Sequence, residues 1–98
     1  MDTKLKALCD KITEDKKEYC RIIGWDWEVQ SHGMTAHCHE GKKYWRVDVG
    51  DSGAYMVDCD GNIFGIKAYG VIHRGHSYGT LDTIGNYFWG DYRAKLKL

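Results

Sequence analysis

The sequence predicts one α+β domain that covers residues 1–98, with an N-terminal helix packed on a roughly five-stranded antiparallel sheet. Two observations lead to this prediction. Apolar residues recur at helical spacing up to about residue 22, and beyond Gly24 they alternate with polar residues at a period of two. The connections between the alternating segments are short and contain glycine, which favours antiparallel neighbours arranged as a meander. An aromatic segment near the end of the chain is expected to fold back onto the sheet edge or the helix.

The predicted helix runs from Thr3 to about Ile22. Gly24 is expected to end it, because glycine readily adopts the left-handed conformation that follows the last turn of many helices. Apolar residues at helical spacing form a stripe along one side, which predicts the face that packs on the sheet. The stripe consists of Leu5, Leu8, Cys9, Ile12, Tyr19 and Cys20.

Five segments after the helix show the alternation that is typical of half-buried strands. They cover residues 25–30, 34–39, 44–49, 54–58 and 63–69. Asp60-Gly61 between the last two is a strong signal for a two-residue hairpin. We expect Trp27, Trp45 and Val47 to face the helix stripe. The opposite face of the sheet is expected to be solvated, because its side chains are polar. These side chains are Glu28, His37, His39, Arg46 and Asp48.

The composition limits the classes of function that fit. Lys and Arg together number 14, as do Asp and Glu, so the formal net charge is zero. Such a chain is a poor candidate for coating nucleic acid through bulk charge, although a local basic patch can still bind it. No apolar run has the length that spans a bilayer, and the N-terminus is charged rather than signal-like. These features favour a cytosolic protein with no membrane partner.

The four cysteines are far apart in the sequence. They lack the close pairing that is typical of a secreted disulfide scaffold or a zinc ribbon. We therefore expect reduced thiols that are mostly buried. The cysteines are Cys9, Cys20, Cys38 and Cys59.

His37 and His39 share one face of a predicted strand, about 7 Å apart, and could supply two zinc ligands. Cys38 between them points to the other face, and the remaining ligands would have to come from elsewhere. The segment Asp58–Asn62 fits a hairpin turn better than a calcium loop, because its glycine comes too early and the terminal glutamate is missing. We therefore expect no metal and no cofactor.

Catalytic motifs are absent from the sequence. It has no phosphate loop and no dinucleotide fingerprint. None of the cysteines has an evident helix N-terminus or histidine partner that would activate it as a nucleophile. The sequence therefore predicts no catalytic residue.

The glycine-rich segment from Gly70 to Gly79 is the main candidate for a binding site. We interpret it as an ordered loop after the last strand, in which Gly75 and Gly79 hold backbone angles that bulkier residues avoid. Arginine binds phosphate in a bidentate manner, histidine titrates near neutral pH, and tyrosine stacks on rings. The alternative is a structural loop whose two tyrosines, with Leu81, close the end of the sheet. The candidate binding residues are Tyr69, His73, Arg74, His76 and Tyr78.

Residues 62–84 resemble a family of small phage-encoded proteins. The shared pattern is D-G-x-I-F-G-I-K-A-Y-G-x-I-H-R-x-H-x-Y-G-T-L-D-T, followed by W-x-x-Y, which is Trp89-Gly90-Asp91-Tyr92 in this chain. The resemblance covers about the last half of the sequence and carries over no catalytic residue. It implies a phage or prophage accessory protein that acts in the cytoplasm of a bacterial host. Such proteins often bind and block a host component.

Three functions remain open at this point. The first is a non-catalytic accessory protein that binds and modulates a host protein or ribonucleoprotein, with inhibition of a bacterial defence system, as in anti-CRISPR proteins, as its specific form. The alternative is a small nucleic-acid or nucleotide-binding protein that uses the Gly70–Gly79 segment. The third, an enzyme that uses His73 and His76, has the least support.

Overall fold

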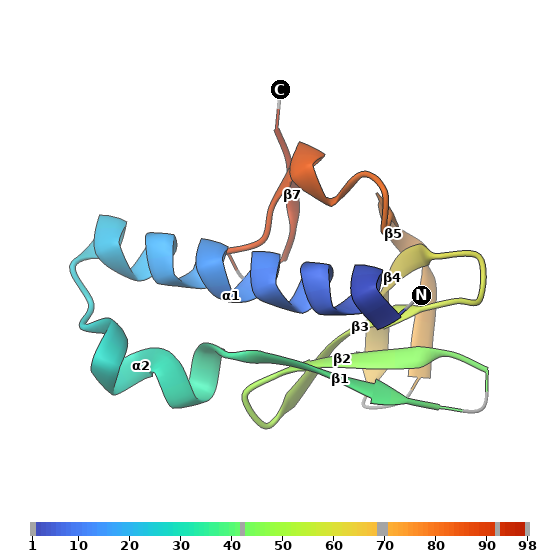
Figure 1. The fold of residues 1–98 in the computed structure, drawn as a ribbon, viewed down its shortest axis with the longest axis horizontal. Coiled ribbons are helices and arrows are strands. Elements are labelled where there is room, and N and C mark those ends of the chain that lie inside the picture. Colours follow the sequence, from blue (N-terminus) through green and yellow to red (C-terminus); the bar gives the residue numbers. More distant parts are fainter. Residues whose placement is uncertain (1, 42, 69–70, 92, 98) are drawn as a thin grey trace.

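The computed structural model of the chain describes residues 2–41, 43–68, 71–91 and 93–97. Within these residues the chain forms two helices and a five-stranded sheet, followed by a short C-terminal segment (Figure 1). The helices are α1 (Asp2–Ile23) and α2 (Trp27–Met34). The strands of the sheet are β1 (Ala36–Glu40), β2 (Trp45–Val49), β3 (Ser52–Val57), β4 (Asn62–Ala68) and β5 (Val71–Thr80). The C-terminal segment contains a 3₁₀ turn (Ile84–Asn86) and the short paired strands β6 (Tyr87–Phe88) and β7 (Lys95–Leu96).

The sheet is an antiparallel meander, because its spatial order β1-β2-β3-β4-β5 equals the chain order. Helix α1 packs against it, and α2 folds back beside α1 at the end of the molecule remote from β5 (Figure 1). This arrangement confirms the predicted α+β class and the meander. Helix α1 ends as predicted: Gly24 has a φ of +79°, and the Trp25 N–H donates to the Cys20 carbonyl at 2.8 Å.

The predicted strand over residues 25–30 is wrong, because the chain forms α2 there. Asp26 caps this helix: its side chain accepts a hydrogen bond from the Glu28 N–H at 3.0 Å. Three alternating apolar residues are too few to distinguish a strand from a short helix, and the cap decides between them. Trp27 therefore lies on α2, outside the buried core, and Glu28 is exposed on α2 rather than on the sheet.

The glycine-rich segment is a strand rather than a loop, and its described part forms β5. Gly70 lies outside the described residues. The pairing with β4 is irregular: Gly65 lies opposite His73, while its neighbour Phe64 lies opposite Ser77. The three residues between His73 and Ser77 therefore form a bulge, which re-aims side chains at a sheet edge.

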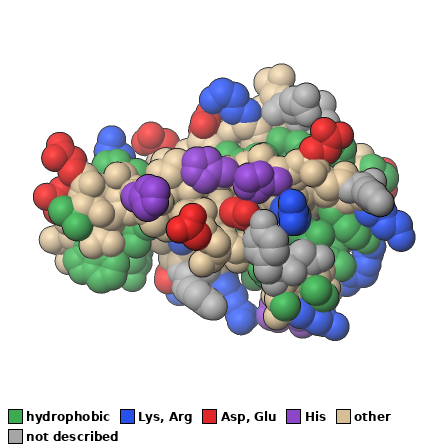
Figure 2. Space-filling model, turned by 90° about the horizontal axis from the view of Figure 1, so that it is seen from below, with side chains coloured by type: hydrophobic (Ala, Val, Ile, Leu, Met, Phe, Trp, Pro, Cys, Tyr) green, Lys and Arg blue, Asp and Glu red, His purple; other side chains and the backbone are tan. Residues whose placement is uncertain are grey.

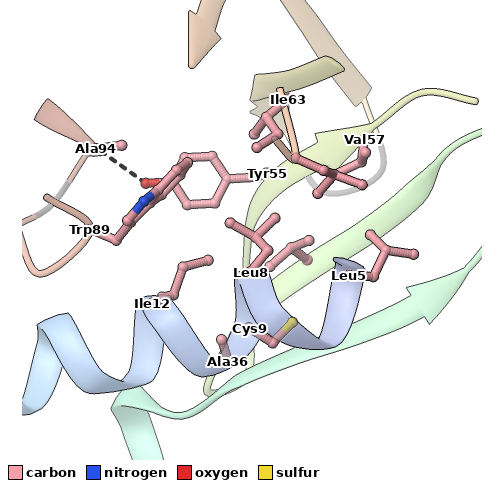
Figure 3. Packing of buried hydrophobic residues seen from close by; sticks show 12 residues of the cluster. Leu5, Leu8, Cys9, Ile12, Ala36, Tyr55, Val57, Ile63, Trp89 and Ala94 are labelled. Atoms are coloured by element: carbon pink, nitrogen blue, oxygen red, sulfur yellow. Dashed lines mark hydrogen bonds between the residues drawn. The ribbon is translucent and has the colours of Figure 1, made fainter. Parts of the chain in front are cut away.

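The core lies between α1 and the sheet (Figure 3). Val47 is fully buried and Trp45 packs against the core from a partly exposed position, so both lie on the predicted face. The ring of Tyr55 meets those of Tyr78 and Trp89 edge-on, with centroid distances of 5.2 Å. The largest fully buried side chains are Trp89, Leu8, Ile12, Ile63, Val47, Val57 and Cys20.

The C-terminal segment folds back onto α1, as predicted. The buried Asp15 carboxylate accepts a hydrogen bond from the Trp89 N–H at 2.9 Å. Lys16 donates to the Asp91 carbonyl oxygen at 2.8 Å. From the sheet, the Tyr55 hydroxyl accepts a hydrogen bond from the backbone N–H of Ala94 at 3.0 Å (Figure 3). These three contacts fix the segment over one end of the sheet.

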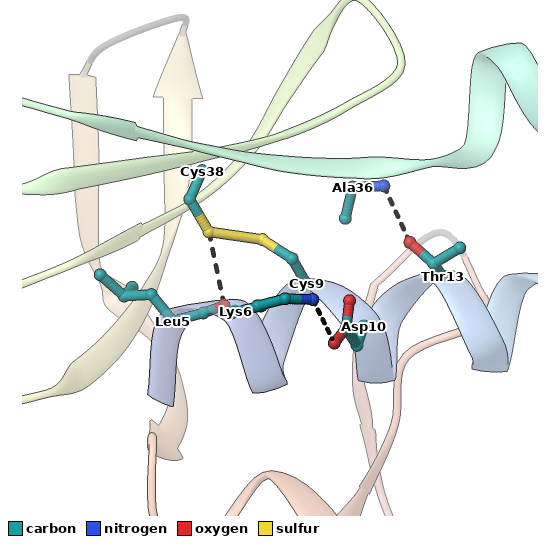
Figure 4. A network of polar contacts seen from close by, with 7 residues as sticks. All are labelled: Leu5, Lys6, Cys9, Asp10, Thr13, Ala36 and Cys38. Atoms are coloured by element: carbon teal, nitrogen blue, oxygen red, sulfur yellow. Dashed lines mark hydrogen bonds and ion pairs between the residues drawn. A yellow bond between two sulfur atoms is a disulfide. The ribbon is translucent and has the colours of Figure 1, made fainter. Parts of the chain in front are cut away.

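Cys9 and Cys38 form a disulfide, so the expectation of four reduced thiols is wrong (Figure 4). Cys9 belongs to the apolar stripe of α1 and Cys38 to the helix-facing side of β1, and packing brings their Cα atoms to 6.9 Å. Sequence spacing alone did not indicate this pair, because 29 positions separate the two residues. Cys20 is buried and free, and Cys59 is exposed and free.

Ile12→Ala should lower the free energy of unfolding by about 2–5 kcal/mol, because the lost methyl groups leave a cavity between α1 and the sheet. Ile22→Ala, on the same helix at 63% exposure, is the matched control and should change stability by less than about 0.5 kcal/mol. Denaturant titration measures both values. Equal effects of the two substitutions would contradict the assignment of the helix face.

Replacing both Cys9 and Cys38 by serine should destabilise the fold by about 3–4 kcal/mol, the cost of releasing a crosslink of this loop length in the unfolded chain. Cys59→Ser is the control, since this thiol is exposed and free. Both proteins are unfolded in denaturant without reductant. A double variant with wild-type stability would show that the crosslink does not form.

Candidate functional site

A cavity of about 290 Å³ opens between α1, the last residues of α2, the strands β2 to β5 and the C-terminal segment. Its lining combines basic side chains, two phenol rings and three glycines. The lining residues are Lys16, Gly33, Val49, Ser52, Gly53, Ala54, Tyr55, Gly65, Ile66, His76, Tyr78 and Arg93. Two of the five residues proposed from the sequence, His76 and Tyr78, belong to this set.

Gly65 makes room for both of these side chains. A Cβ atom at Gly65 would lie 3.1 Å from Cβ of His76 and 3.4 Å from Cε2 of Tyr78. A larger residue would therefore push His76 and Tyr78 away from β4. Glycine at position 65 therefore allows His76 and Tyr78 to pack closely on β4.

His73, beside the bulge of β5, and His76, within it, stack on each other, with ring centroids 4.1 Å apart and planes inclined by 23°. Gly75 permits this stack, because a Cβ atom there would lie 2.9 Å from Cε1 of His73. Nδ1 of His73 is buried and has no hydrogen-bond partner within the described part of the chain. Only His76 of the pair lines the cavity.

Basic side chains line the cavity. Lys16, His76 and Arg93 line it, and no carboxylate side chain does so among the described residues. Burial lowers the pKa of His76, and the nearby His73 and the charge of Arg93 lower it further. Burial also lowers the pKa of Lys16, while Asp91 opposes that shift. The guanidinium of Arg93 lines the same cavity from the C-terminal segment.

The two tyrosines of the lining are partly structural. Burial raises the pKa of Tyr55 strongly, and its hydroxyl already bonds the backbone of Ala94. Burial also raises the pKa of Tyr78, against the opposing charge of Arg93. Tyr78 packs against Tyr55 and Trp89, as in the structural alternative considered for this segment. Leu81 is likewise buried in the core.

The structure separates Arg74 from the other predicted site residues. Its guanidinium lies over the rings of Tyr44 and Phe64, 5.6 and 5.4 Å from their centroids, and it also donates to the Tyr44 hydroxyl. Phe64 and Gly65 are consecutive on β4 and face opposite sides of the sheet. Arg74 therefore lies on the side away from the cavity. Tyr69 lies outside the described residues.

Lys16 and Arg93 are site residues that sequence reasoning missed. They lie 77 positions apart in the sequence. Lys16 continues the apolar stripe of α1, four residues after Ile12, and Arg93 lies in the C-terminal segment, whose return brings both to the cavity. Of the glycines, Gly79 has a φ of +72°, as expected. Gly75 has no positive φ, and its need for glycine is steric.

Histidines also gather on the opposite face of the sheet (Figure 2). His32, His37 and His39 line a hollow of about 470 Å³ together with Asp48 and Asp51. His39 Nε2 lies 3.3 Å from Oδ2 of Asp48. The Asp48 side chain was expected to be solvated, but it is buried. Within the part of the chain that the structure describes, no three His, Cys, Asp or Glu residues are grouped to hold a metal ion. The expectation of no zinc remains a prediction.

Exposed hydrophobic side chains concentrate at the junction of α1 and α2. In the described ranges six large hydrophobic residues are exposed, and four of them fall within residues 22–29. The most exposed are Val29 at 72% and Ile22 at 63%. Figure 2 shows hydrophobic side chains at this end of the molecule. Concentrated apolar exposure of this kind marks interaction surfaces.

Comparisons of the chain with protein-family models, curated proteins and solved structures found no match. The fold and the cavity are therefore the basis for any statement about function. In the described part of the chain, no helix has the length and hydrophobicity needed to cross a membrane.

Proposed function

We propose that this chain is a non-catalytic binding protein whose ligand is a small phosphorylated molecule, held in the cavity between α1 and β5. One observation carries the proposal: three basic side chains, Lys16, His76 and Arg93, line one cavity without a carboxylate side chain among its described residues. The proposal is a form of the nucleotide-binding alternative drawn from the sequence. It differs in the arginine that binds the phosphate, which is Arg93 instead of Arg74.

Phosphate fits these donors. Arg93 offers a planar guanidinium that can bind two phosphate oxygens at once. Lys16 offers an ammonium whose proton an incoming anion would help to retain, since opposite charges favour the charged form. His76 offers a ring N–H and an aromatic face.

The size of the cavity sets the scale of the ligand. About 290 Å³ lies at the lower end of the range of small-molecule sites. A single phosphorylated metabolite matches that volume better than a nucleic-acid strand, which needs a groove along several nucleotides.

Arg93→Gln should weaken the binding of ribose 5-phosphate about tenfold, the effect of losing a charged hydrogen bond of about 1.5 kcal/mol. The comparison is Lys97→Gln, which removes one positive charge from the same tail at a residue that does not line the cavity. Isothermal titration calorimetry at low salt measures both. If wild-type protein shows no binding, or both variants weaken equally, the cavity is not a phosphate site.

A second candidate function rests on the exposed apolar junction of α1 and α2. Following the resemblance to phage proteins, the chain would bind a bacterial host protein through this junction and modulate it, for example by inhibiting a defence system such as CRISPR. Concentrated exposure of Ile22, Trp25 and Val29 favours protein binding at this end. Mixed charges beside it, including Glu18 and Arg21, form a polar rim typical of interfaces.

Under this second function, a bacterial protein should co-purify stoichiometrically with the wild-type chain and be lost with Val29→Lys. Burying an added charge in an apolar contact explains the loss. Val71→Lys, which makes the same substitution at an exposed valine on β5, should retain the partner. Quantitative mass spectrometry of the three purifications decides. Retention of the partner by Val29→Lys would exclude the junction as the interface.

A further inference from the structure

We infer that the phosphorylated ligand is a nucleotide whose base stacks on His76, so that His73, His76 and the base form one continuous stack. This inference rests on the proposed function and specifies the ligand of the same cavity. A phosphate site requires only the basic side chains, whereas the stacked imidazoles supply a second kind of contact. Their arrangement is the observation from which the inference starts.

The stack leaves one ring available on the cavity side. One face of His76 is covered by His73 at a centroid distance of 4.1 Å, and His76 alone of the two lines the cavity. A planar base that enters the cavity can therefore lie against His76. Bases stack on aromatic side chains without a need for specific hydrogen bonds.

The backbone holds this platform in place before any ligand arrives. Gly75 leaves room for the His73 ring, and Gly65 sets the height of His76 above β4. A preorganised ring loses little conformational entropy when a base stacks on it. The lowered pKa of His76 agrees with this arrangement, because it favours the neutral imidazole, which the nearby charge of Arg93 does not repel.

The cavity also places the phosphate donors beside the platform. Arg93 is close enough to His76 for its charge to lower the pKa of that imidazole. Lys16 lines the same cavity from α1. A nucleoside monophosphate joins a flat ring and a dianion through a short ribose, which matches the close spacing of platform and donors. A bare sugar phosphate would use the donors and leave the platform empty.

The test compares AMP with ribose 5-phosphate, which lacks the base, by isothermal titration calorimetry on the full chain. Wild-type protein should bind AMP about tenfold more tightly than ribose 5-phosphate, within the range expected for stacking one base. His76→Ala should reduce this ratio to about one, whereas His76→Phe should keep it, because phenylalanine retains an aromatic face. His37→Ala, which changes a histidine on the other face of the sheet, should leave it unchanged.

The outcomes separate the two proposals. If both compounds bind with equal affinity to wild-type protein, the stacking inference is wrong while the phosphate site stands. If neither compound binds, both proposals are wrong. If His76→Ala keeps the preference for AMP, the base lies elsewhere. Thermal melting of each variant establishes that it is folded. If His76→Ala does not fold, the affinity ratio of His76→Phe is measured instead, and loss of the AMP preference in that variant would contradict the inference.

Discussion

The apolar stripe of α1 is the constraint on which the rest of the structure depends. Leu8 and Ile12 are fully buried against the sheet, and Cys9 of the same stripe is crosslinked to β1. Polar side chains of the same helix hold the C-terminal segment: the Asp15 carboxylate accepts a hydrogen bond from the Trp89 N–H, and Lys16 donates one to the Asp91 carbonyl. One helix therefore organises both the sheet and the segment that closes the cavity.

Three glycines contribute to the wall of the cavity, at places where larger side chains would occupy part of its space. Gly33, Gly53 and Gly65 all belong to its lining. Lys16 comes from the helix and Arg93 from the returning tail, so the positive charge is a product of tertiary structure. A chain with zero formal net charge thus gains a local basic site, a distinction that net charge by itself does not reveal.

Periodic patterns in the sequence predicted α1 and the meander, and turn chemistry predicted the hairpin at Asp60-Gly61. Its loop is longer than the two residues expected, because β3 ends at Val57 and β4 begins at Asn62. The errors fell where local signals are weak. Around Trp27 the short alternation predicted a strand, but the cap at Asp26 begins a helix. The glycines of β5 predicted a loop, although this segment forms a strand. At the site, His76 and Tyr78 were predicted, whereas Arg93 and the Cys9–Cys38 crosslink depend on contacts between distant segments.

The exposed thiol of Cys59 has a practical consequence. It lies in the turn between β3 and β4, where Asp58 accepts hydrogen bonds from the turn backbone and the Gly61 carbonyl accepts one from Leu81 after β5. Cys20 is buried and the other two cysteines are crosslinked, so the natural sequence carries one thiol that a maleimide dye or a spin label can reach without reductant. The label would sit on a rigid turn outside the cavity lining. Movements of neighbouring strands could then be followed spectroscopically without adding a cysteine.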